Sequence, residues 1–369
     1  MSIHFDLASV REIREISVDV ASRLAQSEVM LLTIDSGVVL VAWSQRPDAV
    51  QRIQSMISGE ESLCLGLTGF HQARDYVPHH SPVSKRILTR CWPGPLQAVF
   101  PIHASEGLLA ALPKPVQSAL LHGQQLSLLC PKSPFFRDLQ KLLSGPLVLT
   151  SPLPNDKLSA LTSESPDSTQ QSTCDVIVAN GKPQFSQQGL TVVKFKRDEW
   201  NILRAGSIPP TNLKRMSGTF YLFVCTGNTC RSPMAEGMFR KMLADKLQCD
   251  QEDLAEQGYL VLSAGIAAAE GNPAASEAIQ LLETEGIDIS SHTSRQLTES
   301  LLDQADVVMT LTRGHRNAIL TSRPDLEESV RLLSPSGQDI SDPIGGGMSE
   351  YAACKAEIEQ ALNELIDQI

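Results

Sequence analysis

The sequence predicts an α/β protein of more than one domain, whose second half is built on a doubly wound parallel sheet. Its 369 residues suffice for two or three domains, and 42% of them are apolar. Residues 1–215 carry 21 basic and 18 acidic side chains, whereas residues 216–369 carry 10 and 24. Short apolar stretches alternate with helix-like stretches in the second half, which is typical of a parallel sheet covered on both faces.

The change in charge near residue 215 predicts a domain boundary, with one domain at 1–210 and another at 216–369. The segment Gly206-Ser207-Ile208-Pro209-Pro210-Thr211-Asn212 lies at this boundary. Paired prolines disfavour both a helix and a central strand, so we expect a short linker here.

The second domain shows its expected elements in a regular order. Strands are expected at 220–225, 259–263, 306–310 and 330–333, and helices at about 232–247, 273–286, 296–303, 312–321 and from Tyr351 onward. Ligands of such sheets bind beyond the carboxyl ends of the strands. The first strand ends at Cys225, which predicts a site at this residue.

Composition and charge exclude several function classes. No apolar run approaches the roughly 20 residues of a membrane helix, and the N-terminus lacks a signal-peptide pattern. We therefore expect a cytoplasmic protein without a membrane partner. Neither half has the basic excess that is typical of a nucleic-acid binder. No zinc-like spacing occurs among the cysteines at positions 64, 91, 130, 174, 225, 230, 249 and 354. No metal or cofactor is expected.

The loop 225–231 has the features of a phosphate cradle with a nucleophile in it. Loop amides and the dipole of the following helix both favour a bound anion. The same positive field favours the thiolate of Cys225 over its thiol, while Arg231 offers a planar fork for two phosphate oxygens. The residues expected to shape the loop or contact the substrate are Thr226, Gly227, Asn228, Thr229, Cys230 and Ser232.

A second segment supplies a proton donor for the leaving group. Asp342-Pro343 is followed by Gly345-Gly346-Gly347, which places a carboxyl group on a glycine-rich loop before the last helix. A turn-forming Asp-Pro pair is the alternative interpretation of this segment.

These residues together resemble one family. Cys225-x5-Arg231-Ser232-Pro233 and the downstream Asp342 look like the low-molecular-weight protein-tyrosine-phosphatase family, and the similarity covers residues 217–369. The resemblance implies a phosphocysteine intermediate on Cys225, phosphate binding by Arg231 and acid–base catalysis by Asp342. It also implies a supporting hydrogen-bond network of Asn228, Ser232, Ser263 and His292, and phosphorylated proteins as substrates.

Two positions bear on which phosphorylated side chain is the substrate. Threonine at 229 resembles bacterial protein-arginine phosphatases, whereas tyrosine-specific members usually carry a larger aliphatic residue there. Ile344 stands where both groups usually place an aromatic residue against the substrate. We favour phosphoarginine slightly, and phosphotyrosine stays open.

The first half carries three stretches that are similar to another family. They are Arg90-Cys91-Trp92-Pro93-Gly94-Pro95-Leu96, Gly145-Pro146-Leu147-Val148-Leu149-Thr150-Ser151, and Thr191-Val192-Val193 with Leu203-Arg204 and Gly206 beyond it. Through them residues 1–208 resemble the YrdC-like threonylcarbamoyl-AMP synthase family. The resemblance implies an α/β domain with a twisted, concave sheet.

The active-site residues of that family are missing from this chain. Its lysine and arginine align with Ile57-Ser58-Gly59-Glu60, its Ser-Ala-Asn motif reads Ser151-Pro152-Leu153, and its Ser-Thr-Val-Val motif reads Leu190-Thr191-Val192-Val193. A site for ATP and bicarbonate needs cations, so we predict a domain without catalysis of its own. The alternative to a phosphatase is a protein that binds RNA, double-stranded RNA included, or a nucleotide through this domain, with the phosphatase domain secondary.

Overall fold

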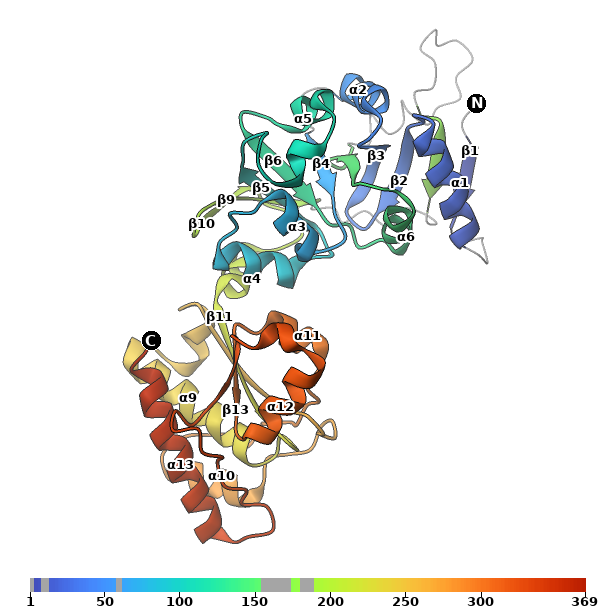
Figure 1. Cartoon of the computed structure of the whole chain (residues 1–369). Helices are drawn as coiled ribbons and strands as arrows, with labels where there is room; N and C mark the ends of the chain where they lie inside the picture. Colours follow the sequence, from blue (N-terminus) through green and yellow to red (C-terminus); the bar gives the residue numbers. More distant parts are fainter. Residues whose placement is uncertain (1–2, 8–12, 58–61, 154–173, 180–188) are drawn as a thin grey trace. The chain divides into compact units, whose positions relative to one another are not determined.

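The computed structural model describes residues 3–7, 13–57, 62–153, 174–179 and 189–369. Two compact units divide the chain, Met1–Leu213 and Lys214–Ile369. Each unit contains a sheet and helices (Figure 1), which confirms the α/β class. Within the described ranges, every helix is too short or too polar to cross a membrane.

The prediction of a linker over residues 206–212 is wrong from Pro210 onward. Helix α8 (Pro210–Ser217) begins inside it, at the second proline. Proline is tolerated in the first turn of a helix, because the amide hydrogen that it lacks has no partner there in any case. The division between the two units falls within this helix.

The first unit is built on a ten-stranded sheet of mixed direction, in the order β1-β8-β2-β3-β7-β4-β6-β5-β9-β10. Its strands are β1 (Ile3–Asp6), β2 (Met30–Ile34), β3 (Gly37–Trp43), β4 (Leu63–Gly66), β5 (Leu96–Pro101), β6 (Gln125–Leu129), β7 (Leu147–Thr150), β8 (Val176–Ala179), β9 (Thr191–Lys196) and β10 (Glu199–Arg204). The helices are α1 (Ile13–Ala25), α2 (Pro47–Met56), α3 (Phe70–Tyr76), α4 (Pro82–Cys91), α5 (Lys114–Leu120) and α6 (Pro134–Leu142), with a 3-10 turn at Gly107–Ala111.

The three stretches that resemble the YrdC-like family lie in or beside this sheet. The first joins α4 to β5, and the indole of Trp92 donates a hydrogen bond to the Leu96 carbonyl at 2.8 Å. The second contains β7, and the third begins in β9. The aligned segment Ile57–Glu60 lies outside the described residues from Ser58 onward.

The second unit is a four-stranded parallel sheet in the order β12-β11-β13-β14, as expected for a doubly wound fold. Its strands are β11 (Thr219–Cys225), β12 (Tyr259–Gly265), β13 (Val307–Thr310) and β14 (Val330–Leu332). Its helices are α9 (Arg231–Leu247), α10 (Ser276–Glu283), α11 (Glu299–Gln304), α12 (Arg313–Ser322) and α13 (Met348–Ile366), with 3-10 turns at Gln251–Ala255 and Pro324–Leu326.

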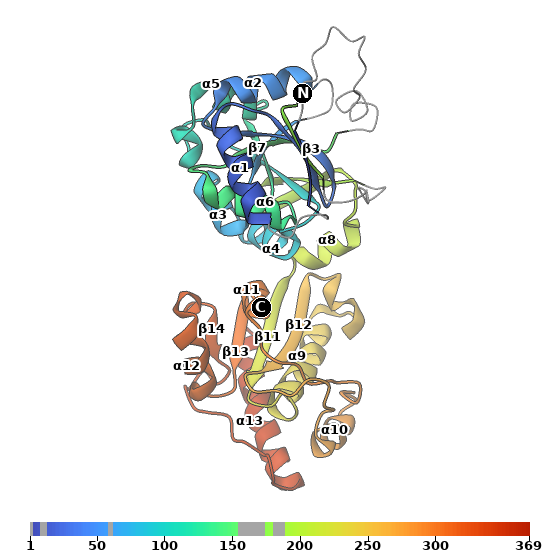
Figure 2. The same ribbon diagram turned by 90° about the vertical axis from the view of Figure 1, so that its right-hand side faces the viewer.

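Alternation along β11 creates two separate cores in this unit. Tyr221, Phe223 and Cys225 belong to one cluster, which includes buried residues of α9, α10 and α13. Phe220 and Val224 belong to a second cluster, with residues of α11 and α12. Successive strand side chains point to opposite faces, so an apolar strand buried on both faces needs helices on each side. Figures 1 and 2 show this arrangement around β11 and β13.

Three helix boundaries in this unit differ from the sequence-based expectation. Helix α10 covers only Ser276–Glu283 of the expected 273–286, and Pro273 forms an isolated bridge with Thr293 instead. Helix α11 begins at Glu299 rather than at 296, because Gln296 is bridged to Gly265. Helix α13 begins at Met348, three residues before the expected Tyr351.

Candidate active site

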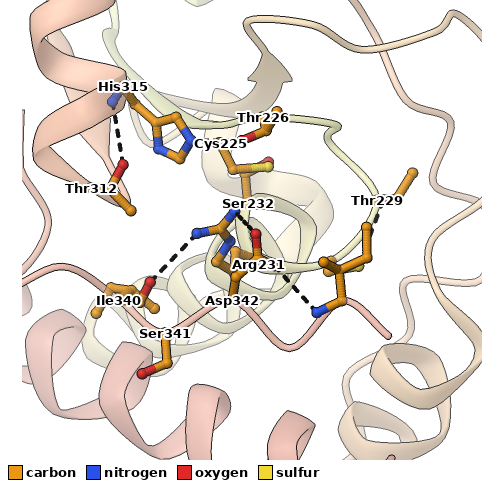
Figure 3. Close-up of polar contacts among 12 residues, drawn as sticks. Cys225, Thr226, Thr229, Arg231, Ser232, Thr312, His315, Ile340, Ser341 and Asp342 are labelled. Carbon is orange, nitrogen blue, oxygen red and sulfur yellow. Dashed lines mark hydrogen bonds and ion pairs between the residues drawn. The ribbon is translucent and has the colours of Figure 1, made fainter. Parts of the chain in front are cut away.

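The sulfur of Cys225 lies at the carboxyl end of β11, facing the first turn of α9. The backbone N–H of Asn228 donates to Cys225 Sγ at 3.2 Å, and Ser232 Oγ lies 2.9 Å from the same sulfur. Figure 3 shows Ser232 beside Cys225 under the loop. The sulfur therefore lies at a helix N-terminus with an amide donor and a hydroxyl group beside it.

Asn228 holds the loop in its conformation from within. It is fully buried with a left-handed φ of 55°. Its side-chain amide donates to Ser232 Oγ at 2.9 Å and to Ser263 Oγ at 2.8 Å, and its side-chain oxygen accepts from the Arg295 amide at 2.9 Å. The Asn228 carbonyl lies 2.9 Å from His292 Nε2. The structure thus brings together the four residues of the expected supporting network.

Arg231 extends from the first turn of α9 towards the loop that carries Asp342. Its guanidinium is buried, donates to the Ile340 carbonyl at 3.4 Å and forms an ion pair with Asp342 Oδ2 (Figure 3). The Asp342 side chain is 44% exposed, whereas that of Arg231 is 6% exposed. The carboxylate therefore lies at the mouth of the site, between the cation and solvent.

The remaining expected contact residues take different positions. Thr229 is half-buried, with its hydroxyl 3.6 Å from Cys230 Sγ. Thr226 and Gly227 are not buried. The Ile344 amide donates to Asp342 Oδ1 at 3.2 Å, but the Ile344 side chain is 71% exposed. The structure therefore does not place this side chain against the loop.

Three residues that the sequence interpretation missed support the loop or its hydrogen-bond network. His315 Nε2, from α12, lies 2.9 Å from Thr226 Oγ1. Tyr351 OH, from α13, lies 3.1 Å from Cys230 Sγ. Glu236 accepts a 2.6 Å hydrogen bond from Ser263 Oγ. Thr312 caps α12 by accepting from the His315 amide, but such a cap predicts only where the helix begins.

Burial controls the ionisation of several side chains around the site. Burial lowers the pKa of His315 below its ordinary value, and the nearby Arg231 cation acts in the same direction. Burial raises the pKa of the Tyr351 hydroxyl, and its contact with Cys230 adds to this effect. Burial also raises the pKa of the Cys354 thiol to about 12, which leaves it protonated and unreactive at neutral pH.

Comparison with known proteins decides the family. The model of the low molecular weight phosphotyrosine protein phosphatase family matches residues 221–369. A protein-arginine-phosphatase of Geobacillus stearothermophilus is 35% identical over 152 residues, which are 40% of this chain and 94% of that protein. The chain belongs to the low molecular weight phosphotyrosine protein phosphatase family. It is thus a phosphatase-family hydrolase, and phosphorylated proteins are the substrates that membership implies.

Other relatives of this phosphatase family carry different names. An arsenate reductase of Staphylococcus epidermidis is 36% identical over 144 residues, 38% of this chain and 90% of that protein. The solved low molecular weight protein tyrosine phosphatase of T. tengcongensis is 34% identical and covers 41% of this chain and 100% of its own, with a TM-score of 0.37.

The first unit adds a second family to this phosphatase. The model of the Sua5, YciO and YrdC proteins, described as telomere recombination, matches residues 22–206. A pocket of about 240 Å³ in this unit is rich in hydroxyl and amide groups. Gln97 donates there to Ser62 and Ser127, and Ser151 Oγ accepts from the Ser62 amide at 3.0 Å. Among the described residues that line it, Arg204 is the one lysine or arginine.

Proposed function

We propose that residues 216–369 hydrolyse phosphorylated protein side chains through a covalent phosphocysteine on Cys225. The arrangement that carries this proposal is the sulfur at the base of the loop with the Arg231–Asp342 pair beside it. Such a site holds a phosphoryl group on amides and a guanidinium, next to a nucleophile and a carboxyl group.

In the first step, Cys225 Sγ attacks phosphorus, an S–P bond forms and the bond from phosphorus to the leaving atom breaks. The proton of the Asp342 carboxyl group passes to that leaving atom. The loop amides and Arg231 stabilise the charge on the equatorial oxygens. A bound phosphoryl group also replaces Asp342 as the partner of the Arg231 guanidinium, and Asp342 can then turn towards the leaving group.

In the second step, water attacks the phosphocysteine. Asp342, now a carboxylate, accepts a proton from this water, the S–P bond breaks and inorganic phosphate leaves with the thiolate restored. Ser232 Oγ, 2.9 Å from the sulfur, supports the thiolate as leaving group in this step. The Asn228 network supports the loop through both steps.

Phosphoarginine is the substrate that we favour over phosphotyrosine. The Thr229 hydroxyl, half-buried on the loop, can accept a hydrogen bond from a guanidinium N–H. The relative named a protein-arginine-phosphatase supports this choice. Ile344 does not separate the two substrates, because both groups usually carry an aromatic residue at its position.

The test compares turnover of matched phosphoarginine and phosphotyrosine peptides by wild type, Thr229→Ile and Thr229→Ser. The serine variant is the control, because it keeps the hydroxyl group. We expect Thr229→Ile to lower the phosphoarginine-to-phosphotyrosine ratio and Thr229→Ser to preserve it. An unchanged ratio in Thr229→Ile would refute the threonine argument. Arsenate-dependent thiol oxidation without phosphate release from either peptide would overturn the phosphatase proposal itself.

For the first unit we propose a role without catalysis. Among the described residues, its pocket is lined mainly by serine, glutamine and apolar side chains, and Arg204 is the one lysine or arginine. A nucleoside triphosphate requires more positive charge around its phosphates than one arginine supplies. The test assays threonylcarbamoyl-AMP formation by the full-length chain, together with binding of ATP and of double-stranded RNA. Formation of the adenylate would contradict this proposal, and tight RNA binding would favour the alternative function.

A further inference from the structure

We propose that a basic pocket beside the active site receives an acidic side chain of the phosphoprotein substrate, close in sequence to the phosphorylated residue. This inference rests on the proposed phosphatase function. The pocket has a volume of about 430 Å³ and lies between α12 and the segment that follows β14. The lining residues are Arg313, Arg316, Asn317, Leu332, Ser334, Pro335 and Gly337.

The charge of the pocket is opposite to that of the unit that contains it. Residues 216–369 carry 24 acidic and 10 basic side chains, yet among the described residues two arginines and no acidic residue line this pocket. Asp339 and Glu327 pair with these arginines from outside the lining. A local cationic site in an acidic protein attracts a single carboxylate, while the overall field repels a polyanion such as a nucleic acid. An isolated acidic side chain on a polypeptide is attracted by the arginines and carries too little charge to be strongly repelled by the acidic unit.

Arg316 is held in place but only loosely neutralised. Its Nε donates to the Val330 carbonyl at 3.1 Å, which fixes the guanidinium against β14. Its carboxylate contact, Glu327 Oε1, lies 4.0 Å away on a largely exposed side chain. Such an exposed pair contributes little, so a substrate carboxylate can compete with it.

Arg313 connects the pocket to the loop that carries the general acid. Its side chain is 67% exposed, and both its amide and its Nε donate to Asp339 Oδ1, at 2.7 and 3.3 Å. Asp339 directly precedes Ile340, whose carbonyl accepts from Arg231. One segment therefore forms contacts with the pocket and with the phosphate-binding arginine.

The pocket lies at the same edge of the sheet as the catalytic loop. β11, β13 and β14 are adjacent parallel strands (Figure 2), and both α12 and the segment after β14 begin at their carboxyl ends. Two strand spacings separate β11 from β14 by about 10 Å. Arg316 is bonded to the Val330 carbonyl, which is level with Leu222 and so about 10 Å before Cys225 along the strands. Four residues of extended polypeptide span roughly 14 Å, the combined distance. An acidic residue about four positions from the phosphorylated residue can therefore reach the arginines.

The test uses two phosphopeptides that are identical except for glutamate or glutamine four positions from the phosphorylated residue, on either side. Wild type and Arg316→Gln are compared by kcat/KM, with p-nitrophenyl phosphate as a substrate that cannot reach the pocket. Arg331→Gln serves as the matched control, since Arg331 lies exposed on β14 outside the pocket.

We expect wild type to prefer the glutamate peptide by about three- to fivefold at low salt, the range of a partly exposed ion pair. Arg316→Gln abolishes this preference, Arg331→Gln keeps it, and turnover of p-nitrophenyl phosphate is equal in all three. Equal turnover of both peptides by wild type, or a preference that survives in Arg316→Gln, overturns the inference. Failure of wild type to release phosphate from any peptide instead refutes the proposed function.

Discussion

Arg231 and Asp342 form an ion pair although they lie 111 positions apart in the sequence. The arginine is nearly buried and the carboxylate is half-exposed. A buried guanidinium without a partner is costly, so the carboxylate partners it until a phosphoryl group replaces it. Asp342 is therefore part of the site before any substrate binds. If it is the general acid, the rate lost on its removal should depend on how much each leaving group needs a proton.

Replacement of Asp342 by asparagine removes the proton donor and keeps the size of the side chain. We expect kcat for phenyl phosphate to fall by about 10²–10⁴-fold, the usual contribution of general acid catalysis. The loss for p-nitrophenyl phosphate should be smaller, because nitrophenolate leaves without a proton. Steady-state rates over a series of substituted phenols measure this. Equal losses across the series would contradict the role of Asp342 as the acid.

Asn228 predicts a stability effect that can be separated into two parts. Asn228→Ala removes three side-chain hydrogen bonds, which together contribute about 3 kcal/mol. It also places alanine at a φ of 55°, which adds about 1 kcal/mol of strain. Asn228→Gly loses the same bonds without this strain, so it should be the more stable of the two variants.

The measurement for these variants needs a probe of the correct unit. All three tryptophans, at positions 43, 92 and 200, lie in the first unit. Hydrogen–deuterium exchange of peptides from residues 216–369 is therefore the suitable readout. If Asn228→Ala and Asn228→Gly protect these peptides as well as wild type does, the network does not stabilise the loop.

Gly265 approaches the catalytic loop so closely that no side chain fits. A Cβ at this position would lie 2.5 Å from the Thr226 carbonyl oxygen and 2.9 Å from the Asn228 amide nitrogen. Gly265→Ala must therefore displace the loop, and a displacement of 1 Å reduces catalysis by about 10²-fold. Gly286→Ala is the control, since no atom lies within 4 Å of a Cβ there, although its φ of 71° strains an alanine. It should lose stability and keep its kcat, and an active Gly265→Ala would disprove the close approach.

His315 predicts that the second unit loses stability as the pH falls. Burial holds its folded-state pKa below the ordinary value, so the unfolded chain binds the proton more readily. The stabilising contribution is complete above about pH 6.5 and is lost as the pH falls towards the folded-state pKa. His315→Gln should flatten this dependence and can keep a hydrogen bond to Thr226. Melting curves of both proteins between pH 5.5 and 8 test this, and parallel pH profiles would refute it.

Local patterns predicted much of this fold and part of its site. The apolar strand before Cys225 and the arginine six residues later lie in one continuous segment, so their spacing indicates the cradle directly. His315, Tyr351 and Glu236 could not be found in this way. His315 and Tyr351 come from α12 and α13, and only tertiary packing brings them to the loop. Glu236 lies in α9, five residues after Arg231, but its contact is with Ser263 on β12.

The errors in the predicted elements have the same cause. Gln296 lies in a helix-like stretch, but its bridge to Gly265 takes precedence over local helix propensity. Pro210 predicts a break and instead begins a helix. In both cases the sequence pattern describes the local preference correctly, while a neighbouring segment or the position within the helix decides the outcome.

The covalent intermediate on Cys225 is the most direct test of the proposed mechanism. The full-length chain is mixed with p-nitrophenyl phosphate, quenched with acid within the first turnover and digested, and the peptides are analysed by mass spectrometry. We predict one phosphoryl group on the peptide that contains Cys225, more of it in Asp342→Ala, where hydrolysis is slowed, and none on this cysteine's peptide in Cys225→Ala. Phosphate release by Cys225→Ala at the wild-type rate, or a phosphoryl group on another residue only, would contradict the mechanism.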